Sequence, residues 1–73
     1  MAAAAPRLGR VVAFDPRRGT GLIRGDDGIE RSFHATRLTD GTRSVEVDAA
    51  VAFVVGPGAR PGSWEAVEVV KTG

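Results

Sequence analysis

The chain has 73 residues, with ten Lys or Arg against nine Asp or Glu, one histidine and no cysteine. A chain of this length forms one domain with a modest core, and without cysteine it has neither a disulfide nor a thiolate metal site. A lone histidine does not make a structural zinc site. We therefore expect no metal, no cofactor, and stability that comes from aliphatic packing and strand pairing.

The chain begins with an alanine-rich run that lacks the long apolar core of a signal peptide. We predict that residues 1–7 form a disordered tail and that residues 8–71 form the folded domain. No segment is long enough to cross a bilayer, and we expect a cytoplasmic protein without a membrane partner.

Turn-forming residues divide the rest of the chain into short segments without a sustained helical period. The predicted strands cover residues 8–14, 20–24, 29–34, 47–55 and 64–70. Turns or loops are predicted at Asp15-Pro16, at residues 25–28 and at residues 56–62. The longest connection, 35–46, is expected to hold one helical turn at 36–38 and a bend at 40–41. Five such strands indicate a small barrel or sandwich, and a barrel is favoured because closure removes the exposed edges of an open sheet.

Alternation along the predicted strands assigns their side chains to two faces. Ile23 and Phe33 are predicted to point inward, with further core candidates at Val11, Val51, Phe53, Val67 and Val69. The outer face of the second and third strands then carries Thr20, Leu22, Ser32 and His34. Ile29 and Arg31 fall on the inner side, and we expect Arg31 at a barrel end where its charged head reaches water.

Positive charge is concentrated in the first half of the chain. Up to Leu38 there are seven arginines and four acids, a net of +3, whereas the remainder has three basic residues and five acids, a net of −2. Arginine forms bidentate contacts with phosphate and stacks on bases, so this half is interpreted as a phosphate-facing surface. The alternative interpretation is an ordinary solvated surface.

Three segments together resemble the cold-shock domain family. Residues 9–23 read G-R-V-V-A-F-D-P-R-R-G-T-G-L-I, similar to the family's opening G-x-V-K-W-F-N-x-x-K-G-F-G-F-I. Residues 29–38, I-E-R-S-F-H-A-T-R-L, resemble its second motif x-D-V-F-V-H-F-S-A-I, and residues 65–71, E-A-V-E-V-V-K, resemble its closing Q-A-A-N-V-x-x. The resemblance implies an all-β, five-stranded antiparallel Greek-key barrel of the OB type that binds single-stranded RNA or DNA.

The departures from the family pattern lie at its base-stacking positions. Ala13 stands where the family has tryptophan, Thr20 and Leu22 replace two phenylalanines, and Ser32 and Ala35 replace two more. Each stacked base contributes about 1–3 kcal/mol in such platforms. We therefore expect weak binding with little sequence preference, in which arginine contributes more than it does in the family.

The residues expected to contact nucleic acid comprise the remaining rings, the outer-face positions and the nearby arginines: Arg10, Phe14, Arg17, Arg18, Thr20, Leu22, Ser32, His34, Arg60 and Trp64. Several of these carry alternatives. His34 either contacts a base or is a hydrogen-bonded surface residue, and the arginines either contact phosphate or are solvated surface charges. Phe14 belongs either to the platform or to the core. Trp64 either forms a stacking plate next to His34 or covers the end of the core.

Enzymatic chemistry is not expected. The glycine-rich segments lack the spacing of a phosphate loop or a dinucleotide fingerprint, and a barrel of this size encloses little volume for a substrate. A second hypothesis is a barrel that has lost nucleic-acid binding and docks on a protein, such as one of the transcription or translation machinery. In either case we expect a monomer.

Overall fold

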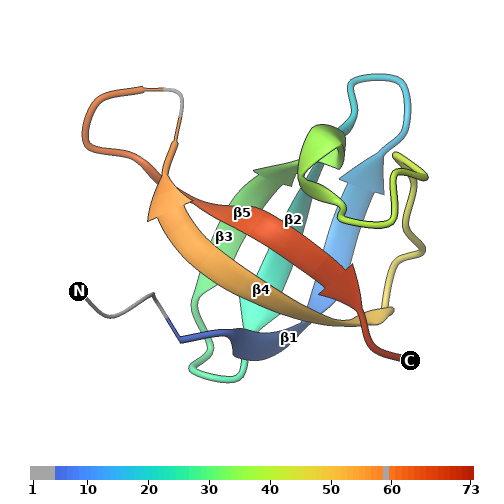
Figure 1. Cartoon of the computed structure of the whole chain (residues 1–73), viewed down its shortest axis with the longest axis horizontal. Coiled ribbons are helices and arrows are strands. Elements are labelled where there is room, and N and C mark those ends of the chain that lie inside the picture. Colours follow the sequence, from blue (N-terminus) through green and yellow to red (C-terminus); the bar gives the residue numbers. More distant parts are fainter. Residues whose placement is uncertain (1–4, 59) are drawn as a thin grey trace.

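The protein is a small closed β-barrel. The computed structural model describes residues 5–58 and 60–73, so residues 1–4 of the predicted tail lie outside the described residues, while Arg7 is the first residue of a strand. The strands are β1 (Arg7–Asp15), β2 (Thr20–Gly25), β3 (Glu30–His34), β4 (Ala50–Pro57) and β5 (Trp64–Lys71), and η1 (Ala35–Arg37) is a single 3₁₀ turn. They close in the order β1-β2-β3-β5-β4 (Figure 1).

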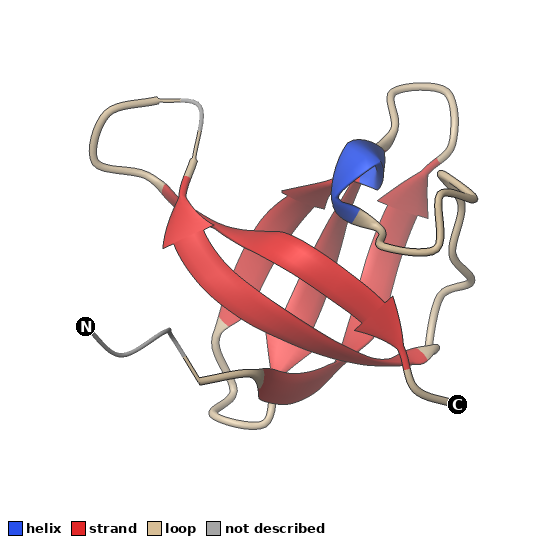
Figure 2. Cartoon of the chain, viewed as in Figure 1, coloured by secondary structure: helices blue, strands red, loops and turns tan. Residues whose placement is uncertain are grey.

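The all-β prediction is confirmed. The described chain is almost entirely strand and loop, with η1 as its one helical element (Figure 2). No helix in the described ranges is long and apolar enough to cross a membrane. β3 and β5 run parallel at the Phe33–Ala66 bridge, and the other four strand pairs are antiparallel.

Local hydrogen bonds explain the predicted turns. The Asp15 carboxylate accepts from the backbone N–H groups of Arg17 (3.0 Å) and Arg18 (3.3 Å), and Gly19, with φ of 68°, donates to the Asp15 carbonyl. At the β2–β3 turn Gly28 has φ of 81°, a conformation that glycine adopts without strain. These contacts confirm both turn predictions and set the positions of β1, β2 and β3.

The fourth strand begins later than predicted. Residues 47–49 precede it: Val47 is 58% exposed, and Asp48 has φ of 76°, which no strand residue adopts. The Asp48 N–H donates to the carbonyl of Val11, so the chain bends against β1 before Ala50 starts the ladder. At its other end β4 continues to Pro57, which pairs with Trp64.

The core is built from aliphatic side chains and two buried phenylalanines. Its buried members are Val11, Ile23, Phe33, Ala35, Leu38, Val45, Val51, Phe53, Ala66 and Val69. Val67 was predicted to be among them and is only half-buried, because a bulge in the β4–β5 ladder moves the pairing from Val54–Glu68 to Val55–Ala66. Ala66 takes the inward position instead.

Arg31 lies at the barrel end next to the β2–β3 turn, as predicted. Its side chain is 12% exposed and donates to the Asp27 carboxylate at 3.0 Å, with the guanidinium 5.8 Å from the centre of the Phe53 ring. Arg7 reaches the same carboxylate from β1. The hydrogen bond from Arg31 and the backbone hydrogen bond from Ile29 lower the pKa of Asp27. Ile29 itself is 53% exposed and precedes β3, which corrects its predicted inward placement.

Candidate nucleic-acid interface

The outer face of β1, β2 and β3 is organised in three cross-strand rows. The register places together, from one end to the other, Asp15–Thr20–His34, then Ala13–Leu22–Ser32, then Arg10–Arg24–Glu30. Adjacent rows are two residues apart along β2 and β3, about 7 Å, and in β1 a bulge between Val11 and Ala13 makes the last two rows three residues apart. We use the name outer face for these three rows, which present five of the sequence-predicted contact residues on one surface.

Gly21 in β2 leaves room for the Phe33 ring on the inner side of the sheet. Gly21 lies between the first two rows on the inner side, and a Cβ there would come within 2.5 Å of Phe33 Cε1 and 2.8 Å of the Ala13 carbonyl oxygen. The Phe33 ring therefore packs directly against the β2 backbone. Its inward position leaves Ser32 and His34 pointing outward.

Phe14 lies between the core and the surface. Its ring stacks on that of Phe33, with centroids 6.0 Å apart, and packs against the core. The same ring edges a shallow hollow with Ala13, Leu22 and Ser32. Phe14 therefore belongs partly to the core and partly to the surface beside the platform. The middle row, Ala13–Leu22–Ser32, carries no aromatic ring.

His34 is fixed at the junction of β3 and η1. Its Nδ1 accepts a hydrogen bond from the Thr36 N–H at 3.3 Å and lies 3.0 Å from the Thr36 hydroxyl. A neutral imidazole that accepts at Nδ1 carries its proton on Nε2. The Ala35 N–H donates to the Gly19 carbonyl at 2.7 Å, which ties the β1–β2 loop to this junction.

An open groove adjoins His34 and separates the outer face from the β4–β5 hairpin. Its lining combines β-strand hydroxyls, η1 and the hairpin: Thr20, Ser32, Phe33, His34, Thr36, Arg37, Pro57, Gly58 and Glu65. We refer to it as the groove. It shares Thr20 and Ser32 with the hollow beside Phe14, so the groove and the outer face form one continuous surface.

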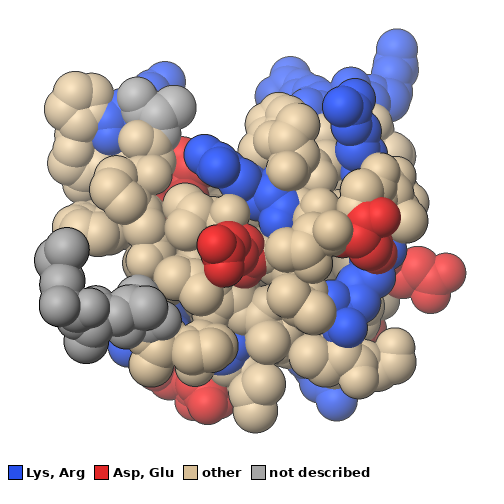
Figure 3. All heavy atoms as spheres, in the orientation of Figure 1, with Lys and Arg blue, Asp and Glu red and all other residues tan. Residues whose placement is uncertain are grey.

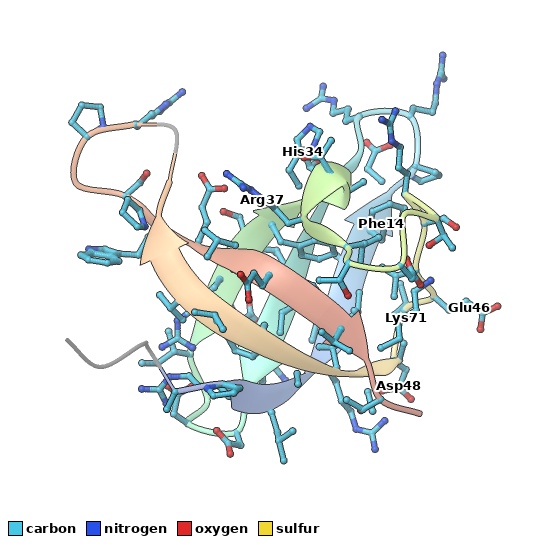
Figure 4. All side chains as sticks on the ribbon, in the orientation of Figure 1. Phe14, His34, Arg37, Glu46, Asp48 and Lys71 are labelled. Carbon is cyan, nitrogen blue, oxygen red and sulfur yellow. The ribbon has the colours of Figure 1, made fainter. Side chains whose placement is uncertain are left out.

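Three segments that border the groove or the hollow carry arginines. Arg17 and Arg18 belong to the β1–β2 loop, Arg37 to η1 and Arg60 to the β4–β5 loop. Among residues 5–58 and 60–73, Arg17, Arg37 and Arg60 have no acidic partner, and Arg18 is 4.0 Å from Asp15. Figure 3 shows basic side chains gathered near the β1–β2 loop and η1, and Figure 4 shows Arg37 on the side of η1 that faces the hairpin.

Comparison with known proteins agrees with this architecture. No family model and no curated protein matches the chain. A solved structure of Drosophila Unr, CSD456, superposes with a TM-score of 0.79 at 18% sequence identity, over 97% of this chain and 28% of the other. The chain has a cold-shock domain fold. It spans little more than a quarter of the Unr structure, and at this identity the likeness concerns the fold alone.

The cold-shock barrel brings Arg10 to the outer face but not to the groove. Arg10 occupies the far row, and its guanidinium donates to the Asp48 carbonyl at 2.9 Å. Directly opposite lies Arg24, which forms an ion pair with Glu30. Arg10 is therefore two rows from His34, at the other end of the candidate interface.

Trp64 does not cover the core. Its side chain is 65% exposed, which makes the core-lid alternative wrong. Trp64 shares a face of β5 with Ala66, and its neighbour Glu65 lines the groove instead. The structure therefore places Trp64 at the hairpin, outside the group of residues that line the groove with His34.

Two charged groove residues, Arg37 and Glu65, were not among the contact residues predicted from the sequence. Arg37 follows His34 by three residues, and residues three apart in a 3₁₀ turn lie on the same side; this spacing was the available signal. Glu65 reaches the groove only because the bulge at Val67 reverses the alternation of β5. No pattern in the sequence indicated that bulge.

Proposed function

We propose that this chain is a single-stranded nucleic-acid-binding module, for RNA or DNA, that binds weakly and with little overall sequence preference. The main support is the continuous surface formed by the outer face and the groove, bordered by segments whose Arg17, Arg37 and Arg60 have no acidic partner in the described part of the chain. Such guanidinium groups bind phosphate without a competing internal ion pair. A polar groove that exposes His34 and strand hydroxyls accepts an unstacked base.

The ring-poor middle row supports the low affinity. Ala13, Leu22 and Ser32 offer no aromatic plate on which a base stacks, and stacking supplies about 1–3 kcal/mol per base in single-strand binders. Phosphate contacts then contribute a large share of the binding free energy. They carry no base information, which is the reason for the weak sequence preference.

A titration at several salt concentrations tests this proposal. A labelled single-stranded dT or rU heptamer should bind with a slope of log K against log [salt] of about −2 to −3, as three or four phosphate contacts predict. Arg17→Gln should reduce the slope by about 0.7, the value of one contact on a single strand. Arg17 lies in the short loop between Asp15 and Thr20, which both line the hollow. Arg43→Gln is the matched control, because Arg43 is an exposed arginine in the 38–49 loop, none of whose residues lines the groove or the hollow.

Absence of binding at low salt, or binding without salt dependence, would refute the proposal. The second candidate function, docking on a protein of the transcription or translation machinery, is favoured by the exposed aliphatic Leu22 in the centre of the outer face. We also propose that the chain acts as a monomer in the cytoplasm. Elution at the mass of a single chain in size-exclusion chromatography would support the monomeric state.

A further inference from the structure

The groove contains one charge that phosphate binding does not explain. Glu65, from β5, and Arg37, from η1, both line it. A surface that only follows phosphate needs cations, and a carboxylate within it repels the ligand. Carboxylates do accept hydrogen bonds from neutral N–H donors, which are present on the edges of bases.

The backbone is arranged to place Glu65 in this position. The bulge at Val67 turns Glu65 to the outside of β5, and Gly58 on the facing strand end has no side chain. A Cβ on Gly58 would collide with the Glu65 carboxylate and with Ser63 Oγ. A carboxylate has about four lone-pair sites, so it accepts several hydrogen bonds at once.

Arg37 complements this acceptor. Its guanidinium lines the same groove and has no acidic partner in the described part of the chain. The groove therefore offers a carboxylate acceptor from β5 and a cationic donor from η1. A ligand edge that carries adjacent N–H donors beside a carbonyl oxygen matches both.

We infer that the groove receives one unstacked base and prefers guanine. On the Watson–Crick edge of guanine, N1–H and N2–H lie side by side next to the carbonyl O6. The Glu65 carboxylate accepts from both donors and Arg37 donates to O6, the bidentate kind of contact that discriminates between bases. Uracil and thymine present one N–H between two carbonyl oxygens, which a carboxylate repels. The inference rests on the proposed function. It concerns one base position, and the other positions of the bound strand are expected to accept any base.

The test uses single-stranded heptamers of dT in which the central base is dT, dA, dC or dG. The dG heptamer should bind about tenfold more tightly than the all-dT heptamer, within the discrimination of one bidentate contact, about 1–3 kcal/mol. Glu65→Gln should reduce this ratio to about twofold or less, because an amide offers one acceptor and one donor in place of two acceptors.

Glu68→Gln is the matched control, since Glu68 is an exposed glutamate of the same strand that does not line the groove. Glu68→Gln removes the same charge as Glu65→Gln but should keep the tenfold preference for the dG heptamer. If a thermal melt shows that Glu65→Gln does not fold, Arg37→Gln takes its place and should weaken dG binding more than dT binding.

The outcomes distinguish a failure of the guanine preference from a failure of nucleic-acid binding itself. Equal, salt-dependent binding of all four heptamers would leave the proposed function intact and overturn the guanine preference. A preference that survives both Glu65→Gln and Arg37→Gln would also overturn it. Failure of every heptamer to bind at low salt would remove the proposed function itself, and the base preference with it.

Discussion

Replacing Gly21 with alanine tests the face assignment on which the interface depends. The new Cβ would lie 2.5 Å from Phe33 Cε1 and 2.8 Å from the carbonyl oxygen of Ala13. Forcing a methyl group into a packed core costs about 1–3 kcal/mol, offset by about 0.4–1 kcal/mol because alanine has less conformational freedom than glycine in the unfolded chain. The expected net loss of about 1–2 kcal/mol corresponds to a melting temperature lower by roughly 4–15 °C.

Gly56→Ala provides the control. The three atoms nearest to its Cβ would all belong to the half-buried Val67 side chain, the closest at 2.9 Å, and a valine methyl can move where a backbone oxygen cannot. Thermal melts followed by circular dichroism should therefore show a smaller change for Gly56→Ala. The double variant Gly21→Ala/Phe33→Leu should lose less stability than the two single losses added together, by about 0.5–2 kcal/mol.

An unchanged melting temperature for Gly21→Ala would refute this reasoning. It would mean that the Phe33 ring does not pack over Gly21, so the register of β2 and β3 would be wrong. The outer face and the groove would then be assigned to the wrong residues.

Three further predictions concern the outer face, Trp64 and the ion pair between Asp40 and Lys71. Leu22→Phe combined with Ser32→Phe should tighten single-strand binding, because it adds two rings to the middle row, at about 1–3 kcal/mol per stacked base; an unchanged affinity by anisotropy would indicate that bases do not reach this row. Trp64→Ala should change the unfolding free energy by less than about 0.5 kcal/mol, as for an exposed residue, and a large drop in the melting temperature would contradict its exposure. The backbone N–H of Thr42 and the Lys71 ammonium lower the pKa of Asp40 from 3.8 to about 2. The stabilisation from the Asp40 carboxylate is therefore fully present above its pKa in the unfolded chain and is lost as the pH falls through its lower pKa in the folded chain. Asp40→Asn should then make the melting temperature fall less steeply with decreasing pH, as measured by thermal melts at successive pH values. An identical fall in the variant and the original chain would contradict this pairing.

Most of the strand pattern was readable from the sequence, because it depends on local chemistry. Asp15-Pro16 and the glycine-flanked turn before Ile29 set where the first three strands end, and alternation within β2 and β3 placed Ile23 and Phe33 inward. Period-2 reasoning holds for as long as the ladder is regular. It predicted the inner and outer faces of β2 and β3, and the structure confirms them.

The sequence prediction was wrong where the ladder is irregular. One extra residue in β5 at Val67 reverses every side chain that precedes it, which exchanges the faces of Trp64 and Glu65. Unbroken alternation from an inward Val67 would have put Trp64 on the outer face and Glu65 on the inner one. The start of β4 was misplaced for a related reason, since nothing local indicates the positive φ of Asp48.

The most direct test of the central claim is a map of backbone amide chemical-shift changes during titration with a single-stranded dT heptamer. The account predicts the largest changes at Leu22, Ser32, His34 and Arg37, on the outer face and around the groove. It predicts little change at Ala52 and Val54, on the opposite wall of the barrel in β4. Changes centred on β4, or no changes at low salt, would contradict the claim that this surface binds nucleic acid.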